Sequence, residues 1–243
     1  MSQAVSDLMP DIRGLITEDD APVDNFLSEK QQRLLTEPLY SSWGGPGDGR
    51  NFLAAANVGI FYIARNPAIV PDVFLSLDVD LSPEWLEREQ RSYFLWEFGK
   101  PPEAVIEIVS NREGDEDREK KRKYARLRVE YYVISDPLGK VMAEPLTVYQ
   151  LHDFDYRKIE APVFPALGLG LSLWEGDFEG HCDTWLRWTD AHGQLILTGR
   201  ERAKLERNRA DEAERALREA REQLARMDSE LRERALDSRP SEE

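Results

Sequence analysis

The sequence predicts a mixed α/β (α+β) domain, in which at least one helix packs on a sheet, followed by a long C-terminal coiled-coil helix. Three observations predict this organisation. Strand-like stretches alternate with helical periodicity between about residues 20 and 195. The aromatic residues, which supply much of a core, all precede residue 190. After Gly199, apolar residues recur at every seventh position.

The elements of the domain are expected in the following order. An amphipathic helix over residues 24–37 has Phe26, Leu27, Leu34 and Leu35 as apolar contacts, and Pro38 closes it. Four strands, each bounded by Pro, Gly or Asp, follow at residues 70–79, 104–110, 129–135 and 146–151. A polar helix over residues 115–128 separates the second strand from the third. The aromatic-rich insertion at residues 82–100 is predicted to be a helix that ends in a turn.

The chain is expected to have four parts: an acidic flexible N-terminus at residues 1–20, the α/β domain at 21–198, a charged coiled-coil helix at 199–237 and a disordered tail at 238–243. The predicted seam of the coil contains Ala203, Ala210, Leu217, Leu224 and Leu231, with Ala213, Ala220 and Met227 three positions after their predecessors. This pattern favours a self-associating coil and therefore a homodimer through residues 200–237. The alternative is a solvated charged helix without a partner.

Composition narrows the possible partners. The net charge of −15 repels a polyanion at long range and counts against an unassisted nucleic-acid role. Seven basic residues nevertheless fall between Arg118 and Arg128, and they could supply phosphate contacts. No apolar run is long enough to span a bilayer, the N-terminus lacks the pattern of a secretory signal, and Cys182 is the only cysteine. We therefore expect a cytoplasmic protein with no membrane partner, in which Cys182 is a small core residue.

Three polar residues stand out because each occurs in an apolar setting. Asp72 heads an apolar strand, where an ordinary capping role is the alternative explanation. Glu107 lies in the middle of a strand that is apolar on both faces, and burying an unpaired carboxylate costs several kcal/mol. Lys120 shares the sheet-facing side of its helix with Tyr124 and Leu127, unless its stem merely covers the core while its ammonium reaches water.

Together these three residues are the minimal set for metal-assisted hydrolysis of a phosphodiester. Carboxylates bind a hard divalent cation such as Mg²⁺, with Mn²⁺ as a substitute, and the cation polarises a phosphate and activates water. A lysine stabilises the nucleophile or helps to generate it. Asp72, Glu107 and Lys120 are therefore the candidate catalytic residues.

Several motifs in order also resemble a known family. They are Pro71-Asp72, the run from Pro101 to Asn111 that contains Glu107, Glu119-Lys120 four residues before Tyr124, and the run from Val129 to Pro137. This string is similar to the Uma-type family of bacterial restriction endonucleases, in the PD-(D/E)XK nuclease superfamily. The resemblance implies a restriction-endonuclease-like fold, which is a mixed central sheet with flanking helices.

The resemblance also implies roles for individual residues. Asp72 and Glu107 would be metal ligands, with the Ile108 carbonyl as a third. The usual lysine position falls on Val109, and the resemblance moves that lysine to Lys120. A polar residue of the first helix often completes such sites, and Glu29, Gln31 and Gln32 all remain candidates. Relatives usually carry glycine where this chain has Arg128, which puts the end of that helix in doubt.

Two functions from different classes remain open. The first is a Mg²⁺-dependent endonuclease that acts on nucleic acid, with double-stranded DNA as the expected partner. The second is a catalytically inactive interaction or scaffold protein that keeps the nuclease fold and assembles through its coil.

Overall fold

The computed structural model describes residues 25–47, 49–64, 66–82, 85, 91–109 and 119–237. The chain divides into two units, Met1–Thr198 and Gly199–Glu243. The predicted flexible N-terminus at 1–20 and the predicted tail at 238–243 lie outside the described residues.

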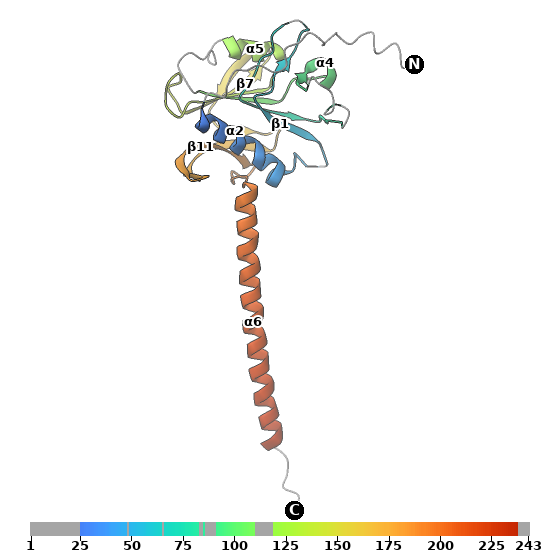
Figure 1. The fold of residues 1–243 in the computed structure, drawn as a ribbon, viewed down its shortest axis with the longest axis vertical. Helices are drawn as coiled ribbons and strands as arrows, with labels where there is room; N and C mark the ends of the chain where they lie inside the picture. The colour runs from blue at the N-terminus through green and yellow to red at the C-terminus, as the bar shows by residue number, and fades with distance from the viewer. Residues whose placement is uncertain are drawn as a thin grey trace, which may run out of the picture. The chain divides into compact units, whose positions relative to one another are not determined.

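The first unit is a mixed α+β fold with a central mixed sheet, as the sequence predicts (Figure 1). Six strands form this sheet in the order β1-β3-β5-β6-β7-β8. Their bounds are Phe52–Ala56 for β1, Val73–Leu77 for β3, Ala104–Ile108 for β5, Tyr131–Ser135 for β6, Leu146–His152 for β7 and Asp155–Ile159 for β8. β5 and β6 are parallel, and the other neighbours in this sheet are antiparallel.

Two smaller sheets complete the unit. β9 (Val163–Phe164), β10 (Leu169–Phe178) and β11 (His181–Asp190) form an antiparallel sheet dominated by the long β10–β11 hairpin. β2 (Ile60–Phe61) pairs with β4 (Tyr93–Phe94) in parallel. Only a short helix, α4 (Leu95–Phe98), follows β4, and Gly99 ends it in the left-handed conformation.

Each face of the central sheet has its own apolar core. Val73, Leu75 and Ile106 pack on one face with α2 (Phe26–Pro38) and the hairpin. Phe74 and Val105 pack on the other face with α5 (Lys121–Leu127). Figure 1 shows the two helices on opposite sides of the sheet. Because successive side chains of a strand point to opposite faces, Glu107 shares the α5 face with Val105.

The first helix differs from its prediction at both ends. Asn25 caps it by accepting hydrogen bonds from the backbone N–H groups of Leu27 and Ser28. Phe26 and Leu27 were expected to be apolar contacts, but they are 88% and 42% exposed. Phe26 lies on the side of α2 opposite the buried stripe formed by Ser28, Gln31, Gln32 and Leu35, while Leu27 lies at its border.

The sequence predicts that Pro38 closes the first helix, and Pro38 is indeed the last residue of α2. The helical path nevertheless continues beyond it. The chain continues as a π-helix, η1 (Leu39–Trp43), and ends at Gly44 with a φ of 72°. At the end of α5, Arg128 adopts the left-handed conformation with a φ of 67°, and its backbone N–H bonds to the carbonyls of Ala125 and Tyr124. The helix therefore keeps a left-handed cap without glycine.

The second unit contains α6 (Gly199–Asp237), a helix of 39 residues. This helix is the predicted C-terminal one. Across the part of the chain that the structure describes, no helix combines the length and apolar character needed to cross a membrane.

Candidate active site

Glu107 is the central side chain of the candidate site. It sits near the carboxyl end of β5 and is 0% exposed. Its Oε2 accepts a hydrogen bond from the Lys120 Nζ at 2.8 Å, and its Oε1 accepts one from the Tyr124 hydroxyl at 2.7 Å. Lys120 immediately precedes α5 as its N-cap residue, and its side chain points inward, as the helical spacing predicts.

Asp72 lies beside this pair, at the head of β3. Its Oδ2 accepts a hydrogen bond from the Ile108 N–H at 2.6 Å, which links the start of β3 to the end of β5. The N–H and C=O of one strand residue point toward the same neighbouring strand, so the Ile108 carbonyl is also directed toward the β3 side. The three predicted ligands are therefore grouped at one end of the β3–β5 pair.

Burial is the largest cause of the pKa shifts of Glu107 and Tyr124 in the site. Burial raises the pKa of Glu107 to about 8, Lys120 opposes this rise, and the negative charge of Asp72 adds to it. The pKa of the Tyr124 hydroxyl is also raised, by burial and by the adjacent Glu107. One ammonium group therefore offsets only part of the cost of two neighbouring carboxylates, one of which is fully buried.

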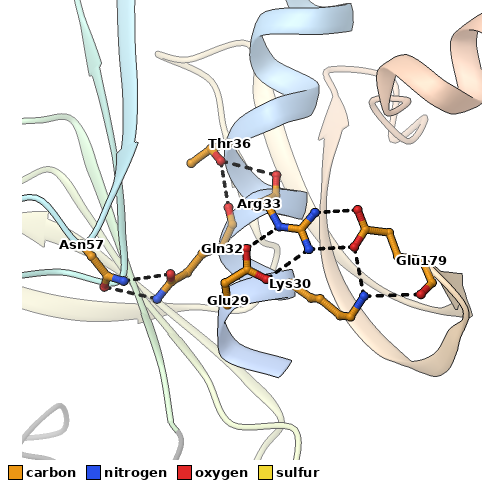
Figure 2. A network of polar contacts seen from close by, with 7 residues as sticks. All are labelled: Glu29, Lys30, Gln32, Arg33, Thr36, Asn57 and Glu179. Carbon is orange, nitrogen blue, oxygen red and sulfur yellow. Dashed lines mark hydrogen bonds and ion pairs between the residues drawn. The ribbon is translucent and has the colours of Figure 1, made fainter. Parts of the chain in front are cut away.

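Of the three first-helix candidates, Gln32 contacts the site. Its Nε2 donates to Asp72 Oδ1 at 3.1 Å. Its amide also forms a reciprocal pair with the Asn57 amide, at 3.0 and 3.2 Å (Figure 2). The contact with Asp72 fixes the orientation of the Gln32 amide, because a flipped amide would turn its oxygen toward the Asp72 carboxylate, which only accepts hydrogen bonds.

The other two candidates are used elsewhere on α2. Gln31 exchanges two hydrogen bonds with the backbone of Leu186 on β11. Glu29 pairs with Arg33, which also binds Glu179 at the tip of the β10–β11 hairpin (Figure 2). The pKa of Glu179 is lowered to about 2 by hydrogen bonds from Arg33 and Lys30. These contacts attach α2 to the hairpin, while Gln32 reaches the site.

The surroundings of two further groups, the carboxyl of Asp136 and the thiol of Cys182, explain their state. Asp136 follows β6 and is fully buried, but it accepts hydrogen bonds from the N–H groups of Lys140, Val141 and Met142. Burial alone would raise its pKa, but these hydrogen bonds outweigh burial and lower it. Cys182, predicted to be a core residue, is exposed because it lies near the turn of the long hairpin.

Two members of this network, Tyr124 and Asn57, were not predicted as site residues from the sequence. Tyr124 was expected only to pack on the sheet, yet its hydroxyl binds Glu107. Its position four residues after Lys120 was the available signal, because residues at this spacing share one helix face. Asn57, which orients Gln32, has a left-handed φ of 54° after β1 and gave no signal in the sequence.

Comparison with known proteins identifies the family. The family model Uma2, described as "Putative restriction endonuclease", matches residues 11–175 of the 243-residue chain. The chain belongs to the Uma2 family. The match to Uma2 includes Asp72, Glu107 and Lys120, and it confirms the family resemblance found in the sequence.

One solved structure is similar to this Uma2 chain. It is described as a putative nuclease belonging to DUF820, from Anabaena variabilis. It is 16% identical, with a TM-score of 0.38, and the alignment covers 62% of this chain and 75% of that one. No curated protein matches the chain.

Proposed function

We propose that this chain is a metal-dependent endonuclease that hydrolyses phosphodiester bonds of double-stranded DNA. The observation that carries the proposal is the hydrogen-bonded set formed by Glu107, Lys120 and the adjacent Asp72. Membership of a family described as "Putative restriction endonuclease" supports nuclease activity and DNA as the substrate.

The donor set fits a hard divalent cation. Two carboxylates from different strands approach each other, and burial makes the charged form of Glu107 costly. A divalent cation would favour that charged form far more than Lys120 alone. Asp72, Glu107 and the Ile108 carbonyl would hold Mg²⁺ or Mn²⁺, which prefer oxygen ligands. When bound, such an ion polarises the scissile phosphate and lowers the pKa of its bound water.

The protein's own groups perform the remaining tasks. Lys120 has 29% of its side chain exposed, so its ammonium can contact a phosphate oxygen while it remains beside Glu107. There it stabilises the negative charge that develops during attack. Tyr124 fixes one oxygen of Glu107, and the Ile108 N–H and Gln32 fix both oxygens of Asp72.

The helix that follows Lys120, α5, also supports contact with a polyanion. Arg122 and Arg126 are exposed on α5. Other basic residues between Arg118 and Arg128 have contacts within the chain. Lys123 pairs with Glu119, and the Lys121 Nζ lies 3.5 Å from the centre of the Tyr149 ring. Arg118 lies outside the described residues. We propose that Arg122 and Arg126 contact DNA phosphates, which lets a chain of net charge −15 approach its substrate locally.

Nicking of supercoiled plasmid tests the proposed function. We expect the full-length protein to nick DNA with Mg²⁺ or Mn²⁺ and to stop when EDTA removes the metal. Asp72→Asn should lower the rate at least about 100-fold, because it removes one charged ligand. Asp78→Asn is the matched control, because Asp78 lies just after the other end of β3 and pairs with Arg50. Salt titration of DNA binding by Arg122→Gln and Arg126→Gln tests the phosphate contacts, and each should reduce the salt slope.

Three results would contradict the proposal. Metal-independent nicking would remove the role of the cation. Equal activity in wild type and Asp72→Asn would point to a contaminant. Purified wild-type protein that binds no divalent cation and cuts no DNA would favour the scaffold function instead.

A further inference from the structure

α6 carries an apolar seam that is open to water. All residues from 202 to 229 are exposed, including Leu217, Leu224 and Met227, which are 52%, 65% and 58% exposed. These three side chains lie on one side of the helix, because they recur at spacings of three and seven residues. Such a side is stabilised when another helix covers it.

The seam has two kinds of heptad position. The first kind, a, contains Ala203, Ala210, Leu217 and Leu224. The second kind, d, contains Glu206, Ala213, Ala220 and Met227. The large apolar residues Leu217 and Leu224 are at a and Met227 is at d, while the four alanines are divided equally between a and d.

We propose that α6 binds α6 of a second copy of this chain as an antiparallel coiled coil. The inference goes beyond the proposed nuclease function and does not depend on it. The orientation follows from the sizes and charges of the residues that would face each other.

Side-chain size favours the antiparallel pair. In this orientation an a residue faces a d residue of the other helix. Ala210 then faces Met227 of the second copy, Ala213 faces Leu224, and Leu217 faces Ala220. Each of these layers joins one small and one large side chain, so the layers between residues 210 and 227 have similar volumes. Parallel helices would instead stack Ala on Ala and Leu on Leu, which gives layers of unequal thickness.

Charge favours the same orientation. Antiparallel coils bring equivalent flanking positions together, so Glu214 faces Arg221 of the second copy and Arg207 faces Asp228. Two-fold symmetry repeats both pairs, which makes four attractive contacts. A parallel coil would place Glu206 against its own copy in the seam and Arg202 beside Arg207. Its one attractive pair, Arg209 with Glu214, is also repeated by symmetry and makes two attractive contacts.

The antiparallel register separates the two ends that lead into the nuclease domains. In this register Gly199 of one chain lies level with the C-terminal end of α6 in the other. At about 1.5 Å per residue the two Gly199 residues are roughly 60 Å apart along the coil. A parallel coil would bring the same two residues side by side.

Charge reversal in the full-length chain tests the orientation. Sedimentation equilibrium should show a dimer, and Glu214→Arg and Arg221→Glu should each raise its dissociation constant about tenfold, since each creates like-charge pairs. The double variant should restore dimerisation, because it exchanges the two signs. In a parallel coil Arg221 faces Ala216, so Arg221→Glu would have little effect and the double variant would show no rescue.

Disulfide trapping gives a second readout that does not depend on affinity. Cys182 is exposed and is the only cysteine, so Cys182→Ser provides a background without thiols. Ala210→Cys combined with Met227→Cys should form a cross-linked dimer under oxidation, whereas Ala210→Cys alone should not. The two positions lie about 25 Å apart on one helix, too far for a bond within a chain. Cross-linking by the single variant, or a monomer at the highest soluble concentration, would overturn the proposal.

Discussion

Glu107→Gln is expected to lower metal-dependent cleavage at least about a thousandfold while leaving the metal-free protein as stable as wild type, or more stable. Loss of cleavage follows because glutamine removes the charge of the buried ligand but keeps its shape. Stability is retained because the buried carboxyl is itself costly: its pKa of about 8 means that folding at neutral pH takes up a proton or buries a charge. Glutamine avoids both costs.

The sign of this effect follows from linkage. A carboxyl whose pKa is raised on folding destabilises the folded state at any pH above its unfolded pKa of about 4.3. The free energy of unfolding of Glu107→Gln should therefore equal or exceed that of the wild type at pH 7 without metal. Mn²⁺ should raise the melting temperature of the wild type only, because the variant has lost a ligand.

Glu103→Gln is the matched control for this experiment. Glu103 lies four residues earlier and also pairs with a lysine, Lys100, but it binds the Leu77 N–H away from the site. It should keep cleavage and the response to Mn²⁺, and it should lose about 1 kcal/mol of stability. Cleavage by Glu107→Gln within about tenfold of the wild type would refute the role of Glu107 as a ligand.

Lys120→Met should lower single-turnover cleavage about 100- to 1000-fold at saturating metal and DNA. Methionine keeps an unbranched apolar stem but removes the ammonium that lies 2.8 Å from Glu107. The variant loses the Lys120 ammonium, which stabilises the transition state more than the ground state because negative charge develops on the phosphate during attack. The rate constant for the chemical step, measured by rapid quench, is the quantity that should fall.

Lys123→Met separates this role from simple loss of charge. Lys123 lies on α5, three residues after Lys120, and pairs with Glu119 on the surface, so both variants remove one positive charge near the site. The control should weaken DNA binding slightly and leave the saturated rate unchanged. Equal rates in the two variants would assign Lys120 a structural role only.

The parts of the fold that depend on local pattern were predictable. β3, β5, β6 and β7 fall within or close to their expected ranges, because β-branched runs bounded by turn residues carry a strong signal. Alternation along β5 also explains why Ile106 lies in one core and Val105 in the other. The inward position of Lys120 followed from helical spacing in the same way.

The parts that depend on long-range contacts were not predictable. The hairpin β10–β11 was missed because its apolar pattern is interrupted, for example by Gly176, whose missing Cβ leaves room for the Trp174 ring. Gln32 could not be separated from Gln31 and Glu29, since the choice depends on Asn57 and Leu186, far away in sequence. Phe26 was misjudged because hydrogen-bonded glutamines, which pattern analysis treats as polar, occupy the buried side of α2.

A crystal of the full-length protein soaked in Mn²⁺ tests most directly whether Asp72 and Glu107 hold a divalent cation. Anomalous scattering locates Mn²⁺ independently of any assumption about the ligands. We expect one peak bonded to oxygens of both carboxylates, at about 2.2 Å, with Lys120 beside it. Absence of a peak there at saturating Mn²⁺, with Glu107 still bonded to Lys120 and Tyr124, would contradict the account.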